Sequence, residues 1–158
     1  MDAILGQTTD YGRRRKLRAI TEGLHSKDFY GATIERIKEQ GGKARLGMAA
    51  LMWISHSERL LQLDELLHAL AMEIGSTDLN AENIPSVETL LSCGLGLLVV
   101  DKEASTVRLI HFSLQEHLNA FPDIFGPTHS IMAEICLTYL NFQTTKDILS
   151  LPKDTSGR

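Results

Sequence analysis

The pattern of hydrophobic and polar positions changes period within the stretch from Val107 to Leu118. From residue 107 to residue 112 the side chains alternate between two faces, which is the two-residue repeat of a β-strand. From Ser113 onward the apolar positions recur at three and four residues, which is typical of a helix. The sequence Ser113-Leu-Gln-Glu116 matches a capping box, in which the Ser113 hydroxyl accepts from the backbone N–H of Glu116. The pattern therefore predicts a strand that ends and a helix that begins, with His111 at the junction.

The remaining hydrophobic pattern is mainly helical. Helices are predicted from Ser26 to the Gly41-Gly42 pair, over 43–56, 63–74 and 86–95, and in a last segment that holds Ile131 to Leu140. Residues 60–63 are expected to form a short turn. Strands over 97–101 and 106–112 flank a polar hairpin loop. Three helices followed by a hairpin predict a mainly α protein with a small β-hairpin, namely a winged-helix core flanked by N- and C-terminal helices. Trp53 is expected in its core.

This pattern divides the chain into three segments. They are an N-terminal helical segment over 1–42, a winged-helix domain over 43–121, and a C-terminal helix with a flexible tail over 122–158. The 158 residues are 43% hydrophobic and 23% charged, which is globular composition. Cys93 and Cys136 lie in apolar helical patterns and are interpreted as reduced core residues. The start of the chain lacks a signal peptide and the apolar runs are short, so we expect a soluble, cytoplasmic protein.

Signatures of catalysis are missing from the sequence. Gly42-Lys43 is followed by Ala44, so the chain has no phosphate-binding loop. The segment Gly94-Leu-Gly96 lacks the third glycine of a dinucleotide fingerprint. The six histidines and two cysteines show none of the spacings of a zinc site. We therefore predict a protein that is not an enzyme, with no catalytic residues and no metal ligands.

A winged helix suggests DNA binding, but the charges argue against it. Between Arg59 and Lys102 the chain has no Lys or Arg, whereas a DNA reader needs cations on its third helix. The same interval carries seven carboxylates, and the net charge is −4. The basic run from Arg13 to Arg18 leaves open an alternative, a nucleic-acid-binding winged helix that uses this run. The role of His111 also has two interpretations, because an imidazole beside a helix N-terminus suits either a phosphate contact or ordinary packing.

Several segments occur in an order that resembles a known family. They are Ala50-Leu-Met-Trp53, Leu63-Asp-Glu-Leu66, Cys93-Gly-Leu-Gly-Leu-Leu-Val-Val100 and Val107-Arg-Leu-Ile-His-Phe-Ser-Leu-Gln-Glu-His-Leu118. Over roughly residues 15–142 the chain resembles the winged-helix segment that follows the NACHT module of STAND NTPases. The resemblance is especially to NACHT–ankyrin proteins of filamentous fungi. That segment is catalogued as the "GPI inositol-deacylase winged helix domain".

The resemblance implies a regulatory and protein-interaction module. Residues 1–42 would hold the end of a NACHT-associated helical lid, and 122–158 would lead towards a missing repeat region. His111 would contact the β-phosphate of ADP and help to hold the inactive state. ADP or ATP would bind only through an absent NACHT module, and no cofactor belongs to this chain itself. The implied partners are the NACHT module and the repeat region, without nucleic acid or membrane, and open apolar surface favours self-association. His117 departs from the family, which usually has an aromatic residue there, so a more exposed ring is expected.

Overall fold

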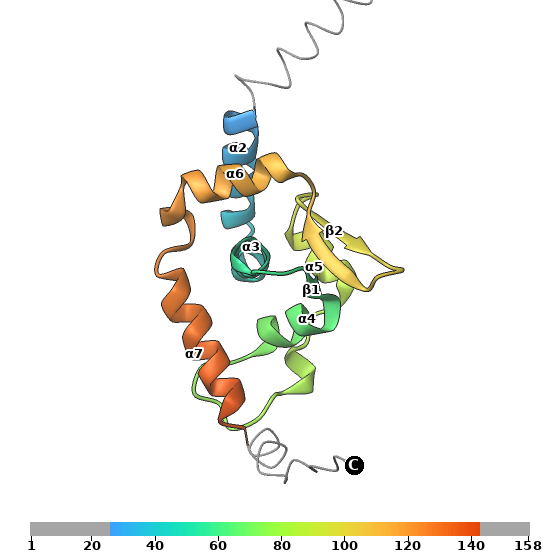
Figure 1. Ribbon diagram of the computed structural model, residues 1–158, viewed down its shortest axis with the longest axis vertical. Coiled ribbons are helices and arrows are strands. Elements are labelled where there is room, and N and C mark those ends of the chain that lie inside the picture. Colours follow the sequence, from blue (N-terminus) through green and yellow to red (C-terminus); the bar gives the residue numbers. More distant parts are fainter. Residues whose placement is uncertain (1–25, 143–158) are drawn as a thin grey trace, which may run out of the picture.

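The computed structural model describes residues 26–142, in which helices surround a small sheet (Figure 1). The α-helices are α2 (Ser26–Lys38), α3 (Ala44–His56), α4 (Leu63–Ala71), α5 (Val87–Cys93), α6 (Phe112–Ala120) and α7 (Thr128–Leu140). Three 3₁₀ turns connect them, at Gly41–Lys43, Ala81–Asn83 and Pro122–Phe125. The strands are β1 (Leu61–Gln62), β2 (Leu98–Asp101) and β3 (Thr106–Leu109). The order α3, α4, α5 and then a hairpin confirms the winged-helix prediction.

The sheet is antiparallel with the order β1-β3-β2. Val107 in β3 lies opposite Val100 on one side and Leu61 on the other. The β2–β3 loop is closed by the Asp101 carboxylate, which accepts from the backbone N–H groups of Glu103 and Ala104, both at 3.0 Å. The turn predicted at residues 60–63 is partly wrong, because residues 61 and 62 form β1. Two residues are too few to show the two-residue repeat of a strand in the sequence. β1 is defined by its pairing with the edge of β3.

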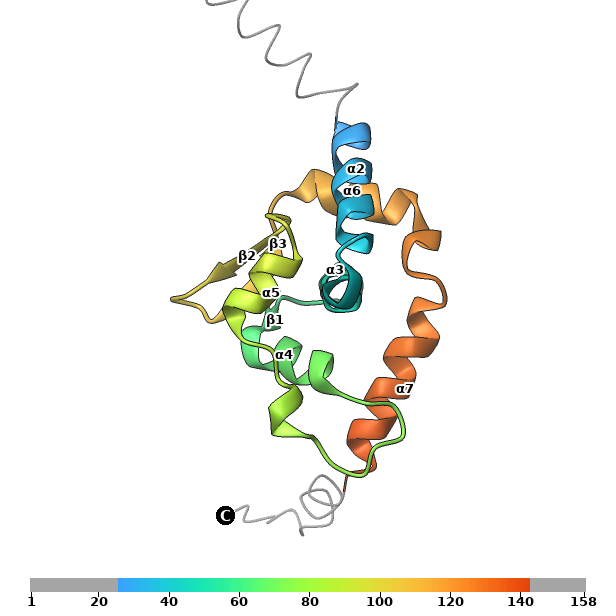
Figure 2. The same cartoon turned by 180° about the vertical axis from the view of Figure 1, so that it is seen from behind.

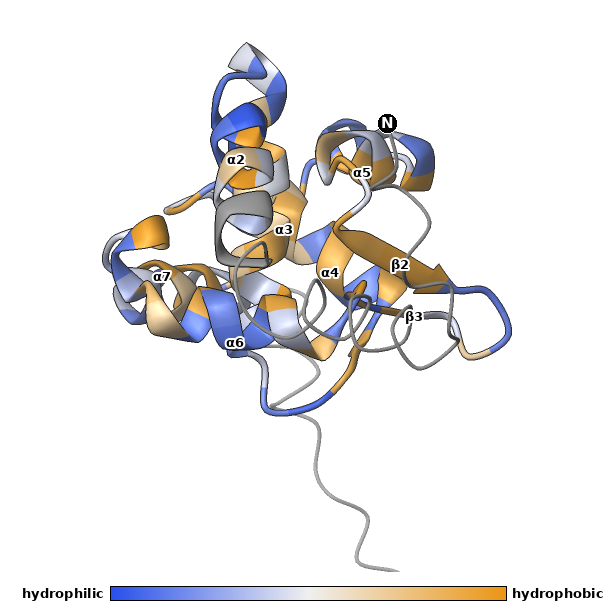
Figure 3. Ribbon diagram, turned by 90° about the horizontal axis from the view of Figure 1, so that it is seen from above, coloured by the Kyte–Doolittle hydropathy of each residue, from blue (hydrophilic) through white to orange (hydrophobic). Residues whose placement is uncertain are grey.

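Helix α3 is the centre of the hydrophobic core. Seen end-on in Figures 1 and 2, it lies between α7 on one side and the sheet on the other. Ala50 and Leu51 are fully buried, and Trp53 is 9% exposed, as predicted. Around them pack buried residues of the other elements: Ile34, Ile37, Leu66, Leu67, Leu90, Val107, Leu114 and Leu118. In Figure 3, α3 and β2 are hydrophobic along most of their length, whereas the β2–β3 loop is hydrophilic.

A glycine sets the distance between α3 and α5. A Cβ atom at Gly47 would lie 2.7 Å from the backbone oxygen of Cys93 and 2.9 Å from the side chain of Ile37. Residue 47 must therefore lack a side chain for α5 to approach α3 this closely. Cys93 itself is buried, as predicted.

Helix α7 covers α3 with only one of its sides. Ile131, Met132 and Ile135 pack against the core, while Leu137, Tyr139 and Leu140 are 59%, 53% and 48% exposed. Cys136 is exposed, so its predicted place in the core is wrong. It follows Ile135 directly, and the 100° step of a helix turns it away from α3. Among residues 26–142 no helix combines the length and the apolar content needed to cross a membrane.

Candidate functional site

His111 occupies the junction between β3 and α6. Its backbone is extended, with φ −153° and ψ 151°, and it is the N-cap residue of α6. Its Nδ1 atom accepts from the backbone N–H of Ser113 at 3.1 Å, which satisfies one of the free N–H groups in the first turn. The predicted position of His111 at the end of a strand and the start of a helix is thus confirmed.

The predicted capping box is wrong, because the helix begins earlier than Ser113. Phe112 is already helical, which places Ser113 inside the first turn and makes His111 the cap. The Ser113 hydroxyl bonds instead to the Tyr30 hydroxyl and to Nδ1 of His111, both at 2.8 Å. A residue of α2 is therefore tied directly to the start of α6, and in both views of the fold α6 lies across α2 (Figures 1 and 2).

The partner from α2 could not be read from the sequence. Tyr30 lies 83 residues before Ser113, and no local pattern connects them. Tyr30 also packs against His117, with ring centroids 5.7 Å apart, and the ring centroid of Phe121 lies 5.0 Å from that of His117. His117 is buried, with 8% exposure, so the expectation of a more exposed ring is wrong. The imidazole packs against two aromatic rings.

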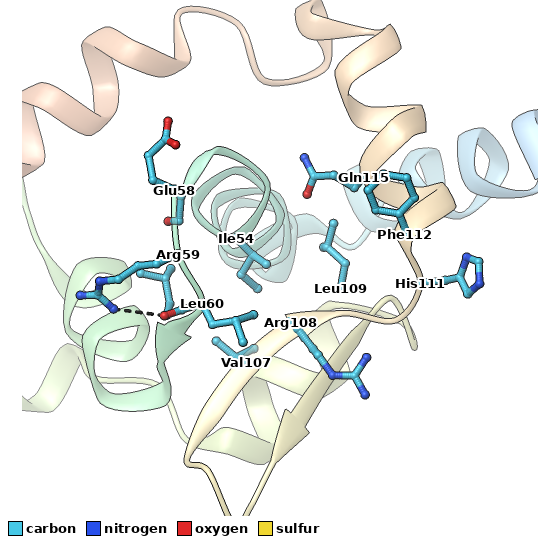
Figure 4. Close-up of a pocket in the computed structure, with 12 residues that line it drawn as sticks. Ile54, Glu58, Arg59, Leu60, Val107, Arg108, Leu109, His111, Phe112 and Gln115 are labelled. Atoms are coloured by element: carbon cyan, nitrogen blue, oxygen red, sulfur yellow. Dashed lines mark hydrogen bonds between the residues drawn. The ribbon is translucent and has the colours of Figure 1, made fainter.

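Beside His111 the surface has a hollow of about 280 Å³ between β3, α6 and the segment before β1 (Figure 4). We call it the Phe112 hollow, after the residue at its rim. Phe112 is 72% exposed and Leu60, on the opposite rim, is 60% exposed. Ile110, next to His111 in the chain, is 46% exposed. Two large apolar side chains, Phe112 and Leu60, are thus exposed to water at one hollow, which is typical of a docking surface.

Two arginines line the Phe112 hollow and differ in what they bind. The Arg59 guanidinium donates two hydrogen bonds, of 2.7 and 2.9 Å, to the Glu65 carboxylate. Those bonds, with the backbone N–H of Gln62, lower the pKa of Glu65 to about 2. The hydrogen bond to Glu65 likewise raises the pKa of Arg59. Arg108 projects from β3 (Figure 4) and has no ion pair with any residue between 26 and 142. Arg108 and His111 are therefore the polar groups of this surface that are open to an anion.

The third helix of the winged helix, α5, carries no Lys or Arg. Helix α5 carries one charged residue, Glu88, which is exposed. Hydrogen bonds from its own backbone N–H and from Ser86 hold the pKa of Glu88 below its usual value. The basic run from Arg13 to Arg18 lies outside the described residues. Within residues 26–142 no group of three or more metal-ligating side chains is close enough to hold an ion.

Comparison with known protein families identifies the family to which this winged helix belongs. A family model described as "GPI inositol-deacylase, winged helix domain" matches residues 34–123, which is more than half of the chain. The chain belongs to this family. The matched range includes the core helices α3, α4 and α5, all three strands, and α6 with the His111 junction. The winged helix of this family is an accessory domain and not a catalytic one. The comparisons found no similar curated protein and no similar solved structure.

Proposed function

We propose that the chain is a non-catalytic regulatory module of a NACHT-type STAND signalling protein. It packs on a nucleotide-binding module through the Phe112 hollow and helps to hold that module in its inactive state. Residues 1–42 connect to the helical lid of that module, and 122–158 lead towards a repeat region such as ankyrins. The proposed location is the cytoplasm. The observation that carries the proposal is the group of exposed apolar side chains beside His111.

The physical argument starts from Phe112. A side chain of this size that moves from water into an interface contributes roughly 1.5–3 kcal/mol. Together with Leu60, it gives the hollow two apolar rims that a partner helix or loop can cover. Aromatic residues are frequent anchors of protein–protein interfaces.

The polar groups of the same surface suit a nucleotide held by the partner. His111 and Arg108 are exposed and lie at the edge of the hollow. A ring N–H and a guanidinium are both donors to phosphate oxygens. In this proposal His111 contacts the phosphate of ADP only when the nucleotide-binding module supplies the rest of the site. The chain by itself is expected to bind neither ADP nor ATP.

A binding experiment in trans tests the proposal. The probe is the purified NACHT module of a protein that carries this winged-helix family, with and without ADP. We expect Phe112→Ser to weaken binding by about tenfold or more in both conditions, which is about 1.4 kcal/mol. His111→Ala is expected to weaken it only when ADP is present. Leu91→Ser, at an exposed apolar position on α5, is the matched control.

Two results would contradict the proposal. The first is that Phe112→Ser and Leu91→Ser weaken binding to the module equally. The Phe112 hollow would then not be the surface that binds the module. The second comes from calorimetric titration of ADP and ATP into the chain alone. Micromolar binding that disappears with His111→Ala would mean that the chain carries a complete nucleotide site of its own.

A further inference from the structure

A continuous chain of two hydrogen bonds links α2 to the ring of His111. The Tyr30 hydroxyl lies 2.8 Å from the Ser113 hydroxyl, which lies 2.8 Å from Nδ1 of His111. The same Nδ1 receives the backbone N–H of Ser113 at 3.1 Å. Both hydrogen bonds to the ring end on Nδ1, and Nε2 makes none with residues 26–142. The question is where the proton of the ring sits.

The backbone bond decides the position of that proton. A backbone N–H can only donate, so Nδ1 must be the acceptor and carry no hydrogen. A neutral imidazole has one N–H, which is then on Nε2. Because Nδ1 has no hydrogen to give, the Ser113 hydroxyl must donate to it. That leaves the Ser113 oxygen to accept from the Tyr30 hydroxyl, so the chain of donors runs from Tyr30 through Ser113 to His111.

We propose that Tyr30 and Ser113 are positioning residues that hold His111 with its proton on Nε2 and couple the orientation of its ring to helix α2. The exposed atom of His111 is then a hydrogen-bond donor, as a phosphate oxygen requires, and not an acceptor that would repel it. The inference rests on the proposed function only for the anion that Nε2 meets. The hydrogen-bond chain and its effect on the ring belong to the isolated chain and are tested there.

The coupling has a regulatory consequence. Tyr30 belongs to α2, whose C-terminal half packs against α3, whereas His111 belongs to the junction at the edge of the Phe112 hollow. Any displacement of α2 relative to α6 separates the Tyr30 and Ser113 hydroxyls. The Ser113 hydroxyl then loses the donor that fixes its direction, so its own hydrogen bond to Nδ1 of His111 is no longer held in one orientation. A movement of α2 thereby changes the orientation of the His111 ring at the proposed phosphate contact.

Nitrogen NMR on the whole chain measures this directly. Long-range proton–nitrogen spectra report which imidazole nitrogen carries the proton, and are recorded at alkaline pH, where the ring is neutral. The parent is expected to show His111 as a single Nε2–H tautomer. In Ser113→Ala and Tyr30→Phe, the Nδ1 and Nε2 signals of His111 are expected to move towards each other. The change is partial because the backbone N–H of residue 113 remains, and it is smaller in Tyr30→Phe.

The controls separate a local effect from a change of fold. Tyr139→Phe removes the hydroxyl of an exposed tyrosine on α7 and should leave His111 unchanged. The exposed His68 on α4 is the internal reference in every spectrum. Tyr30→Phe keeps the buried ring, so it decides the question even where Ser113→Ala fails to fold. His111 signals identical to those of the parent in a folded Tyr30→Phe would overturn the coupling to α2. A parent ring with its proton on Nδ1 would overturn the proposal as a whole, without touching the trans-binding test.

Discussion

The stretch from Val107 to Leu118 carries two sets of apolar side chains with opposite environments. Val107, Leu109 and Leu114 point into the core and are 0%, 8% and 0% exposed. Ile110 and Phe112 alternate with them and are 46% and 72% exposed. The inner set is explained by the fold, since α3 covers it. The outer set is left uncovered by the fold of residues 26–142, and Phe112 in this set belongs to the proposed docking surface. Hydrophobicity alone does not distinguish a core residue from a docking residue.

The largest expected effect compares one aromatic residue from each environment. Trp53→Ala removes a side chain that is 9% exposed, and the cavity and the lost transfer energy should destabilise the protein by about 3–5 kcal/mol. Phe112→Ala removes a side chain that is 72% exposed, and the effect should be within about 0.5 kcal/mol. Urea denaturation of both variants measures the two free energies of unfolding. Equal losses in the two variants would mean that Phe112 belongs to the core and not to a docking surface.

A smaller effect compares two glycines in neighbouring helices. Gly47→Ala places a Cβ atom 2.7 Å from the backbone oxygen of Cys93, and such overpacking typically costs about 1–3 kcal/mol. Gly31 in α2 has nothing within 4 Å of an added Cβ, so Gly31→Ala should stabilise the protein by up to about 1 kcal/mol. The two thermal melting temperatures should therefore move in opposite directions. A stabilised Gly47→Ala would show that α3 and α5 do not meet closely at this position.

The sequence predicted the parts of the fold in which period and local chemistry agree. The helices α3, α4 and α5 and the hairpin follow from apolar positions at helical and strand spacing. The position of His111 between β3 and α6 was also predicted correctly. The error at Ser113 has a physical cause. A Ser-x-x-Glu sequence satisfies the capping rule locally, but the first helical turn begins at Phe112, and the Ser113 hydroxyl bonds to Tyr30.

The candidate site also depends on contacts that no local sequence pattern predicts. The bond from Tyr30 joins residues 83 positions apart, and the same Tyr30 ring packs against the buried His117. Cys136 and Leu137 on α7 have an apolar sequence but face outward, because a helix that packs with one side leaves the others open. Contacts between distant segments decide these positions. The family resemblance supplied the role proposed for His111, whereas the physical pattern supplied only its location.

The smallest expected effect is on how the stability of the protein depends on pH, and it distinguishes the two arginines of the Phe112 hollow. Because its folded-state pKa is lowered from 4.5 to about 2, ionised Glu65 favours the folded state. This contribution is fully present above pH 4.5 and is lost as the pH falls towards 2. Glu65→Gln should therefore flatten the acid side of the stability curve, with chemical denaturation at several pH values as the measurement. Arg108→Gln should leave that slope unchanged, because no carboxylate among residues 26–142 pairs with Arg108. An equal flattening in Arg108→Gln would mean that Arg108 is already engaged and is not open to an anion.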